Sequence, residues 1–272
     1  RSETVDDIAT ATPYAALSAT LDWPAPLAGQ RPAPGTPLPY LWHWLYFLPM
    51  YAQSEIGADG HAKRGSFLPP VPLPRRMWAG SRVRYLADVP IGAKATRRSL
   101  ILKVENKVGK RGSLWFVTVE HMISCGGKPC IMEEQDIVYR EPSPPKASSG
   151  EPLVAGDWRE AVTPSSTLLF RYSAVTFNGH RIHYDRKYVT EVEGYPGLIV
   201  HGPLIATMLM DLVRRQMPGA EVASFSFKAV RPTFDLHAFK VNGAPQADGK
   251  TVRLWAQDHD GWLTMDAVAT VR

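Results

Sequence analysis

A stretch rich in proline and serine divides this chain into two parts and limits the folds open to it. Between residues 140 and 166 it contains the run EPSPPKASSG, and few apolar residues follow until Leu168. Proline stiffens such a segment into an extended spacer. It leaves about 140 residues before it and about 107 after it, each near the size of one compact module. We therefore predict an N-terminal module at 1–145, a linker at 146–165 and a C-terminal module at 166–272.

Both parts carry strand signals of the same kind, late in each part. Runs rich in Val, Ile and aromatic residues are separated by short turns that contain glycine. In the second part we expect turns at Asn242-Gly243 and Asp260-Gly261. This pattern predicts antiparallel strands in both halves and a similar architecture for each. The expected strands are 99–108, 113–123 and 130–139 in the first half, and 223–230, 238–242, 251–257 and 263–272 in the second.

One helix is predicted between the linker and the last strands. Gly202 is tolerated as its cap, and Pro203 suits its first turn because proline lacks the N–H that would be unpaired there. The pair Arg214-Arg215 suits the negative end of the helix dipole. An apolar helix followed by an antiparallel sheet that can wrap it is an α+β arrangement. The apolar positions recur with a period near 3.6, at Leu204, Ile205, Met208, Leu209, Leu212 and Val213.

Composition and charge exclude several classes of protein. With 44% hydrophobic and 21% charged residues, the chain has the profile of a folded protein and not of a disordered one. The net charge of +5 comes from 31 basic and 26 acidic residues, and the basic residues are scattered, so we expect no nucleic-acid binding. No run of about 20 apolar residues could span a membrane and no signal peptide is visible, so we expect a cytoplasmic protein that does not engage membranes. Cys125 and Cys130 are expected to be free thiols.

The candidate chemistry lies in two segments, 172–185, reading YSAVTFNGHRIHYD, and 197–204, reading GLIVHGPL. Together they resemble the hydratase-2 signature of the MaoC-like hot-dog hydratases and dehydratases. His183 matches the histidine of its H-x-D end, and 199–202 match its I-V-H-G. The resemblance implies that these residues line an acyl-thioester tunnel and that the N–H of Gly202 contributes to an oxyanion hole.

Four runs extend the resemblance into the first half of the chain. They are similar to the N-terminal half of the bacterial mesaconyl- and itaconyl-CoA hydratase group, which is related to the mitochondrial type 2 hydroxyacyl-thioester dehydratases. Members of that group are double hot-dog proteins. The resemblance implies an α+β fold of two hot-dog modules, each an antiparallel sheet wrapped around a long helix, with an active second half and a degenerate first half that shapes the substrate tunnel. The four runs are 42–44 (WHW), 65–70 (GSFLPP), 75–80 (RRMWAG) and 135–140 (QDIVYR).

One position departs from the hydratase-2 signature. Where that signature has an Asp, five residues before the His, this chain has Asn178, and where it has an Asn this chain has His180. An amide cannot take a proton from water and can only orient a water or a carbonyl. We therefore assign the base to His183, whose unperturbed pKa near 6.5 suits neutral pH, and an orienting role to Asn178. The type 2 dehydratases resemble this chain here, which favours a modified site over an inactive one.

The expected chemistry follows from the needs of a thioester. Adding water to an α,β-unsaturated acyl-CoA places negative charge on the thioester oxygen as the enolate forms. A prearranged N–H at a helix start stabilises that charge. Gly202 stands at this point and has no side chain to keep the thioester away from the backbone. His183 would take the proton of the water that attacks C3, and a proton would then return to C2.

Six more residues are candidates to bind or position substrate. The forked guanidinium groups of Arg75 and Arg76 match the phosphates of CoA or a substrate carboxylate, although an exposed, solvated pair is an equal alternative. The aromatic run Trp42, Trp44, Tyr46 and Phe47 is better explained as core packing than as substrate contact. The six candidates are His180, Arg75, Arg76, Trp78, Tyr172 and His201.

A metal site is the weaker interpretation of one histidine-rich spacing. His180, His183 and Asp185 have H-x-x-H-x-D spacing, but no further ligands are visible beside them. We expect no metal, and no cofactor apart from the coenzyme A that is part of the substrate.

The favoured function is that of a hydro-lyase acting on a short branched dicarboxylyl-CoA, with itaconyl-CoA or mesaconyl-C4-CoA giving citramalyl-CoA. One alternative is a 3-hydroxyacyl-thioester dehydratase of fatty-acid synthesis. The other is a non-catalytic subunit that binds acyl-CoA, which Asn178 in place of an Asp would explain. Hot-dog folds often pair through sheet edges, so we expect a homodimer.

Overall fold

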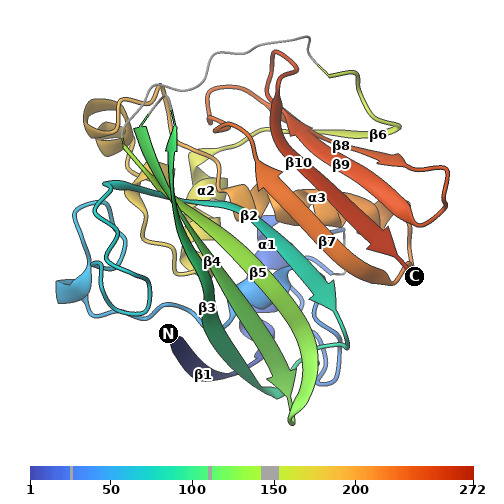
Figure 1. Cartoon of the computed structure of the whole chain (residues 1–272). Helices are drawn as coiled ribbons and strands as arrows, with labels where there is room; N and C mark the ends of the chain where they lie inside the picture. Colours follow the sequence, from blue (N-terminus) through green and yellow to red (C-terminus); the bar gives the residue numbers. More distant parts are fainter. Residues whose placement is uncertain (25–26, 110–111, 142–152) are drawn as a thin grey trace.

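The described part of the chain forms one antiparallel sheet of ten strands that curves around a long helix (Figure 1). The structure is a computed structural model that describes residues 1–24, 27–109, 112–141 and 153–272. Neighbouring strands in the sheet follow the order β1-β3-β4-β5-β2-β7-β10-β9-β8-β6. The strands are β1 (Ser2–Ile8), β2 (Arg75–Tyr85), β3 (Lys94–Gly109), β4 (Gly112–Cys125), β5 (Lys128–Arg140), β6 (Trp158–Val162), β7 (Val222–Ala229), β8 (Phe239–Pro245), β9 (Thr251–Gln257) and β10 (Leu263–Val271).

The two halves of the sheet repeat one strand order. Read from its outer edge inward, the first half runs β1-β3-β4-β5-β2 and the second runs β6-β8-β9-β10-β7. The second strand of each half, β2 or β7, pairs antiparallel with the other, and this pairing joins the two halves into one continuous sheet. Gly80 lies at this seam, where a Cβ would stand 2.4 Å from the Phe227 carbonyl oxygen. The prediction of two architecturally similar halves is therefore confirmed.

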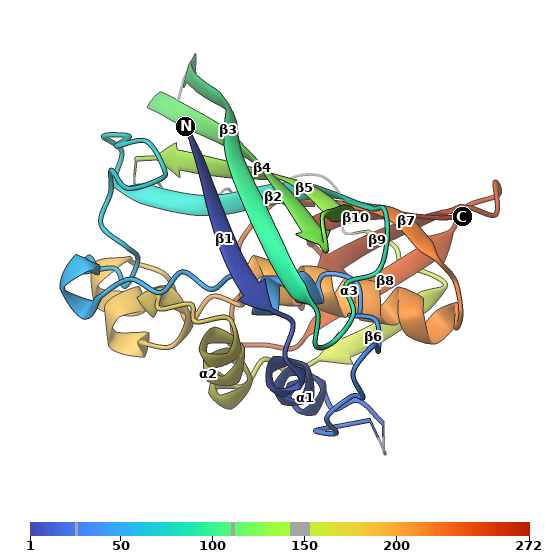
Figure 2. The same cartoon turned by 90° about the horizontal axis from the view of Figure 1, so that it is seen from below.

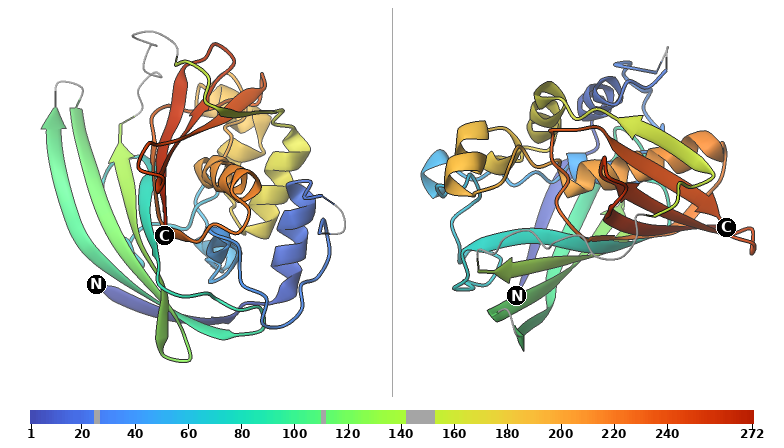
Figure 3. Two further views of the ribbon diagram at one scale, coloured as in Figure 1. Left: turned by 90° about the vertical axis from the view of Figure 1, so that its right-hand side faces the viewer. Right: turned by 90° about the horizontal axis from the view of Figure 1, so that it is seen from above.

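The helices lie on one face of the sheet (Figure 2), and the second half holds the longest of them. In the first half, helix α1 (Ala11–Thr20) is followed by the 3-10 turns η1 (Trp42–Leu45) and η2 (Gln53–Glu55). In the second half, α2 (Ser166–Val175), the 3-10 turn η3 (Arg181–His183) and the π-helical turn η4 (Tyr188–Val192) precede α3 (Gly202–Gln216). The sheet wraps α3 (Figure 3). Between its first two strands the second half has the 15-residue helix α3, whereas the described part of the first half has the 10-residue helix α1 and the turns η1 and η2.

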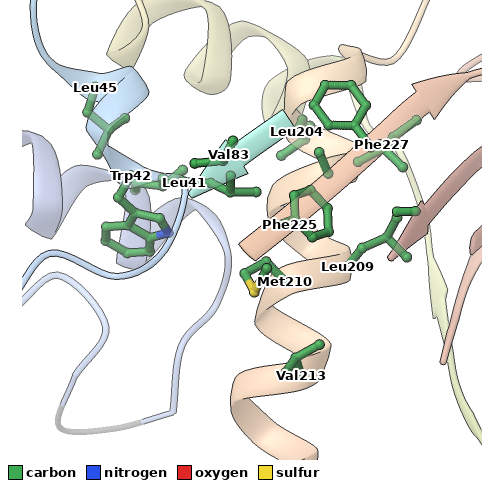
Figure 4. Close-up of a cluster of buried hydrophobic side chains, with 14 of the residues drawn as sticks. Leu41, Trp42, Leu45, Val83, Leu204, Leu209, Met210, Val213, Phe225 and Phe227 are labelled. Atoms are coloured by element: carbon green, nitrogen blue, oxygen red, sulfur yellow. The ribbon is translucent and has the colours of Figure 1, made fainter. Parts of the chain in front are cut away.

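Helix α3 forms where the apolar spacing predicts it. Its N-cap is His201, one residue before the predicted cap, and proline stands in its first turn. Asp211 lies one turn before the C-terminal end and pairs with Arg214 and Arg215. The buried apolar side chains of α3, among them Leu204, Leu209, Met210 and Val213, contact β7 on one side and the first half of the chain on the other (Figure 4).

The core unites both halves. Leu41 and Trp42 of the first half are 1% and 2% exposed and belong to the same buried cluster as Leu204 and Phe225 of the second (Figure 4). The prediction that the aromatic run near residue 42 packs in the core is therefore confirmed. Burying these side chains removes hydrophobic surface from water, which stabilises the fold by about 25 cal/mol for each Å² of apolar surface buried.

Seven predicted strands are present, but one predicted turn is wrong. Asn242 and Gly243 lie inside β8, and the hairpin turns at 246–250 instead, where Asp248 accepts hydrogen bonds from Lys250 N and Thr251 N. Asn242 is fully buried, and its amide donates to Gln257 Oε1 at 2.9 Å, so the side chain serves the sheet and not a turn. The predicted turn at Asp260 is confirmed, and both cysteines are free.

The predicted module boundaries remain a prediction. Part of the expected linker, 146–152, lies outside the described residues, and β6 falls in the remainder of it. Within the described residues, no helix is both long and apolar enough to cross a membrane.

Candidate active site

Two loops from opposite halves of the chain meet beside η3. One is 57–62 of the first half and the other is 177–185 of the second, and Figures 1 and 2 show their segments side by side. Arg181 joins them, since its backbone N–H donates to Asp59 O at 2.9 Å and its guanidinium to Ala58 O at 3.0 Å. A Cβ on Gly60 would stand 1.8 Å from Gly179 O, so only glycine fits this contact. The candidate site is therefore assembled from both halves.

Four histidines form a row of neighbouring rings where these loops meet. The ring centroids of His61 and His180 are 3.9 Å apart, and those of His180 and His183 are 5.5 Å apart. His201, at the start of α3, stacks on His183 with a centroid distance of 3.7 Å. The structure thus brings together three histidines expected from the sequence and adds His61, which was not expected.

His183 has a defined orientation. Its side chain is buried, and Nδ1 lies 2.7 Å from Ile199 O, which can only accept a hydrogen bond. Nδ1 therefore carries the proton, and Nε2 presents a lone pair. Burial lowers the pKa of His183 to about 4, because a charged ring would lose its hydration there. At neutral pH the group is an uncharged acceptor.

The neighbouring histidines are also neutral. Burial, followed by the nearby charges of His61 and His183, lowers the pKa of His180 to about 2. His201 has no exposed surface, and burial holds its pKa well below the usual value. Its Nε2 lies 2.8 Å from Ser173 Oγ, and its ring lies 5.0 Å from that of Tyr172. His201 and Tyr172 therefore support the stacked ring of His183 from behind.

A carboxylate reaches this cluster from the first half. Asp59 Oδ2 accepts from His61 Nδ1 at 3.0 Å, and Asp59 Oδ1 accepts from the His61 backbone N–H at 3.0 Å. Burial alone would raise the pKa of Asp59, but its bonds to His61 outweigh burial and lower it, so Asp59 is ionised. Burial lowers the pKa of His61 while the bond to Asp59 opposes that change. The Asp-Gly-His run that precedes the GSFLPP run is the sequence signal for this pair.

Asn178 and Asp185 hold the second loop in shape. Asn178 Oδ1 accepts from His180 N at 3.0 Å, so the amide orients the loop that carries His180. Asp185 bonds Arg181 at 2.7 Å and the backbone N–H of Tyr188 at 3.0 Å. Asp185 is therefore occupied within its own loop, and the H-x-x-H-x-D spacing does not produce a ligand set. Asp59, His61 and His180 offer three ligand-type atoms within 4.8 Å of one another, and Asp59 and His61 are already hydrogen-bonded to each other.

Gly202 occupies the first turn of α3. The first backbone bond of that turn runs from Ile205 N–H to His201 O, so the N–H of Gly202 has no partner within the helix. A Cβ on Gly202 would meet Met265 Cε at 3.8 Å, an ordinary contact. Packing against the described residues therefore does not require glycine at position 202. The missing side chain leaves open space beside the Gly202 N–H, which lies at the positive end of the helix dipole.

The two neighbouring arginines of β2 differ in their surroundings. Arg75 is paired with Glu193 at 3.1 Å and donates to Glu193 O and Tyr195 Oη. Arg76 lies near enough to His61 and His180 for its charge to lower the pKa of both. Among the residues that the structure describes, no carboxylate lies within 4.0 Å of Arg76. Trp78, farther along β2, packs on Trp44 and Phe227 and donates to Ser81 Oγ, and its predicted contact with substrate stays a prediction.

The repeated five-stranded sheets around a central helix, with a histidine-lined site beside the start of that helix, are the features of double hot-dog hydratases and dehydratases. The model of the hydroxyacyl-thioester dehydratase type 2 family matches residues 41–235, and the chain belongs to that family. The predicted double hot-dog fold is confirmed by solved structures such as the MaoC-like dehydratase of Phytophthora capsici, which is 15% identical with a TM-score of 0.67 and matches 100% of this chain and 95% of that one.

Two curated relatives indicate the class of reaction. The mesaconyl-C(4)-CoA hydratase of Chloroflexus aurantiacus is 44% identical over 98% of this chain and 94% of that protein. The mitochondrial hydroxyacyl-thioester dehydratase type 2 of Schizosaccharomyces pombe is 26% identical over 71% of this chain and 73% of that protein. The prediction that the chain is a hydro-lyase is therefore confirmed.

Proposed function

We propose that the chain adds water reversibly to the double bond of a short branched dicarboxylyl-CoA, with itaconyl-CoA or mesaconyl-C4-CoA giving citramalyl-CoA. The identity of 44% to a mesaconyl-C(4)-CoA hydratase over nearly the whole chain supports this substrate class. The structural observation that carries the proposal is the cation Arg76, which lies beside the histidine cluster without an acidic partner in the described part of the chain.

Arg76 suits the free carboxylate of such a substrate. A guanidinium group binds a carboxylate through two parallel charge-assisted hydrogen bonds. Its neighbour Arg75 is already paired with Glu193 and cannot offer the same fork without breaking that pair. We therefore assign the distal carboxylate of the substrate to Arg76 and a bracing role to Arg75.

The remaining groups suit the chemistry of hydration. The N–H of Gly202 lies at the positive end of α3 and would stabilise the thioester oxygen as that oxygen gains charge. Nε2 of His183 would accept a hydrogen bond from the attacking water and draw it toward C3 of the acyl group. Asn178 holds the backbone N–H of His180 through its amide oxygen, and its predicted role in orienting a water or a carbonyl stays a prediction. The proposed reaction needs no metal and no cofactor apart from the coenzyme A of the substrate.

A second candidate is a 3-hydroxyacyl-thioester dehydratase of fatty-acid synthesis, which the description of the matching family favours. Its substrate has no distal carboxylate, so Arg76 would lack a partner there. A non-catalytic acyl-CoA-binding subunit is the third candidate, and the ordered acceptor at His183 argues against it.

The cellular setting is also a proposal. We propose a cytoplasmic homodimer that pairs through one of the two sheet edges, β1 or β6, since each has a single neighbour in the sheet. Light scattering on the purified chain would give the mass of the particle, and a monomer would contradict this part.

The proposed reaction is tested by incubating purified protein with itaconyl-, mesaconyl-C4- and crotonyl-CoA and with an acyl-carrier thioester, and by measuring the products by mass spectrometry. We expect a gain of one water on a dicarboxylyl-CoA, at a rate well above that on crotonyl-CoA. Faster conversion of the carrier thioester would favour the dehydratase. Tight binding without conversion of any thioester would favour the non-catalytic subunit.

A further inference from the structure

Within the described residues of the second half, no carboxylate is bonded to His180, His183 or His201. The amide of Asn178 stands at the position of the signature carboxylate, and it is bonded to the backbone of His180. His183 is bonded to a carbonyl and stacked on a neutral histidine. Asp185 is held by Arg181 and by the backbone of Tyr188. A proton placed on His183 would therefore be buried without a counter-charge, which is costly.

The first half supplies what is missing. Asp59 accepts the Nδ1 proton of His61, so the second ring nitrogen, Nε2, carries a lone pair. A carboxylate in this arrangement fixes the tautomer of the imidazole and stabilises the imidazolium that forms when Nε2 takes a proton. In the described cluster of four histidines, His61 alone has a carboxylate bonded to its ring.

The position of this pair relative to the other histidines is fixed by the backbone. The loop that carries Asp59 and His61 is closed by Gly57 N–H, which donates to His61 O at 2.7 Å. Arg181 ties the same loop to the loop of His180 through two hydrogen bonds, and Gly60 touches Gly179. His61 is thereby held in ring contact with His180, which in turn contacts His183. A surface ion pair would not need these backbone contacts between two distant segments, so they indicate that the position of His61 matters for the site.

We infer that His61, supported by Asp59, is the second acid–base group of the site and receives the proton of the attacking water. This inference rests on the proposed hydration, and it assigns the role of base to a residue of the first half and not to His183. The N-terminal module then takes part in the chemistry, in addition to shaping the tunnel.

Hydration transfers one proton to His61 and later returns it to the substrate. In an α,β-unsaturated thioester such as mesaconyl-C4-CoA, the water oxygen forms a bond to C3 and one of its protons passes to Nε2 of His61. The π electrons of the C2–C3 bond move into the C1–C2 bond, and those of the carbonyl move onto the thioester oxygen. The resulting imidazolium is paired with Asp59 while the enolate lies at the N–H of Gly202. The enolate re-forms the carbonyl as C2 takes the proton back from His61. The substrate gains one water, and His61 and Asp59 end in their initial states. His183 accepts a hydrogen bond from the second hydrogen of the water throughout.

The test compares two substitutions at the pair with two at a matched pair elsewhere. His61→Gln and Asp59→Asn remove the imidazole and the charge. His259→Gln and Asp260→Asn change another His–Asp pair, which is exposed and lies 3.5 Å apart outside the site. General acid–base groups contribute about 10²- to 10⁴-fold, so we expect His61→Gln to lower kcat by that factor with KM changed by only a few fold. The control variants keep the kcat of the wild type.

The pH profile separates a chemical role from a structural one. The groups facing His61 are Asp59, Arg76 and His180. In the wild type the acidic limb of kcat/KM reports protonation of His61. Asp59→Asn removes the anion that favours the imidazolium, so the limb moves to lower pH, and His61→Gln abolishes it. A merely structural role would lower activity without moving the limb. Circular dichroism and the melting temperature show whether each variant is folded.

Three results would overturn the inference. A His61→Gln variant with kcat within tenfold of the wild type would leave His183 as the base, and an unmoved limb in Asp59→Asn would remove the support of the carboxylate. Loss of activity in a chelator, restored by a divalent metal ion, would assign Asp59, His61 and His180 to metal binding instead. A wild-type protein that hydrates no thioester would instead contradict the proposed function, so the two failures are distinguishable.

Discussion

Gly60 and Gly179 touch through their backbones, and this contact joins a loop of the first half to a loop of the second. A Cβ on Gly60 would lie 1.8 Å from Gly179 O, and one on Gly179 would lie 2.8 Å from Gly60 O. Both distances are shorter than side chains tolerate, so the contact requires glycine on each side. Asp59 and His61 flank one glycine, and Asn178 and His180 flank the other. The geometry of the whole histidine cluster depends on this contact.

Replacing Gly60 with alanine should therefore separate the two loops. The Gly60 φ of +88° adds backbone strain to the steric clash. We expect Gly60→Ala to lower hydration activity by about 100-fold or more, since an ångström of misplacement can cost that much. Gly35→Ala is the matched control, because Gly35 has a φ of +87° and no heavy atom within 4 Å of its Cβ position. The control should lose about 1–3 kcal/mol of stability through strain alone and keep its activity. Equal activity in the two variants would contradict the account.

Arg76 and Arg75 should differ as substrate contacts. Arg76→Gln removes the proposed partner of the distal carboxylate, and we expect KM for a dicarboxylyl-CoA to rise by about 10- to 100-fold, in line with loss of a charge-assisted hydrogen bond. KM for crotonyl-CoA, which has no such carboxylate, should change by much less. Steady-state kinetics with both substrates, run beside Arg75→Gln, measures this. A similar loss on both substrates would remove Arg76 from the recognition of the carboxylate.

Stability should fall as the pH is lowered from 6.5 to 4.5. Burial lowers the pKa of His183 to about 4 and that of His201 well below its usual value, so the folded chain binds fewer protons than the unfolded chain in this window. Each such histidine then destabilises the fold by about 1.4 kcal/mol per pH unit as the pH falls. Chemical unfolding at several pH values gives the slope of the free energy of unfolding against pH. His183→Gln should reduce this slope by the contribution of one histidine, about 1.4 kcal/mol per pH unit. An unchanged slope in the variant would contradict the burial of a neutral ring.

The helix inside the sheet should tolerate little loss of volume. Leu209 has no exposed surface and lies in the buried cluster shared by both halves. We expect Leu209→Ala to lower the free energy of unfolding by about 2–5 kcal/mol. Val154→Ala, at a side chain that is 85% exposed, should change it by less than about 0.5 kcal/mol. Urea denaturation measures both, and a small effect at Leu209 would show that the core relaxes around the helix.

The sequence predicts those elements whose pattern is regular. The period of apolar residues identifies α3, and runs of β-branched residues identify seven strands. Three strands were not predicted, because β1 and β6 are short edge strands with many exposed residues, and β2 carries four arginines. The turn expected at Asn242 was wrong because a buried amide can serve as a strand residue when Gln257 satisfies it. Local pattern does not show which partner a polar side chain will find.

The catalytic candidates were predicted only in the second half, whereas Arg75, Arg76 and Trp78 of the first half were predicted to bind substrate. His183 and Gly202 belong to segments that are close in sequence, so their motif is visible in the chain. Asp59 and His61 lie in the other half, and the backbone contact that brings them in spans 123 residues between Ala58 and Arg181. Only the docking of the two loops reveals that a carboxylate reaches the cluster although Asn178 stands in the signature position.

Exchange of the substrate hydroxyl with labelled water tests the central claim most directly. The purified wild type is incubated with a hydroxylated dicarboxylyl-CoA such as citramalyl-CoA in water enriched in ¹⁸O, and the mass of the recovered thioester is measured beside that from His183→Gln. A reversible hydratase replaces the C3 hydroxyl on each cycle of dehydration and hydration, so the account predicts a shift of about 2 Da in the wild type. The variant should show that shift far more slowly. A recovered thioester without label in the wild type would contradict the assignment of this site to reversible hydration.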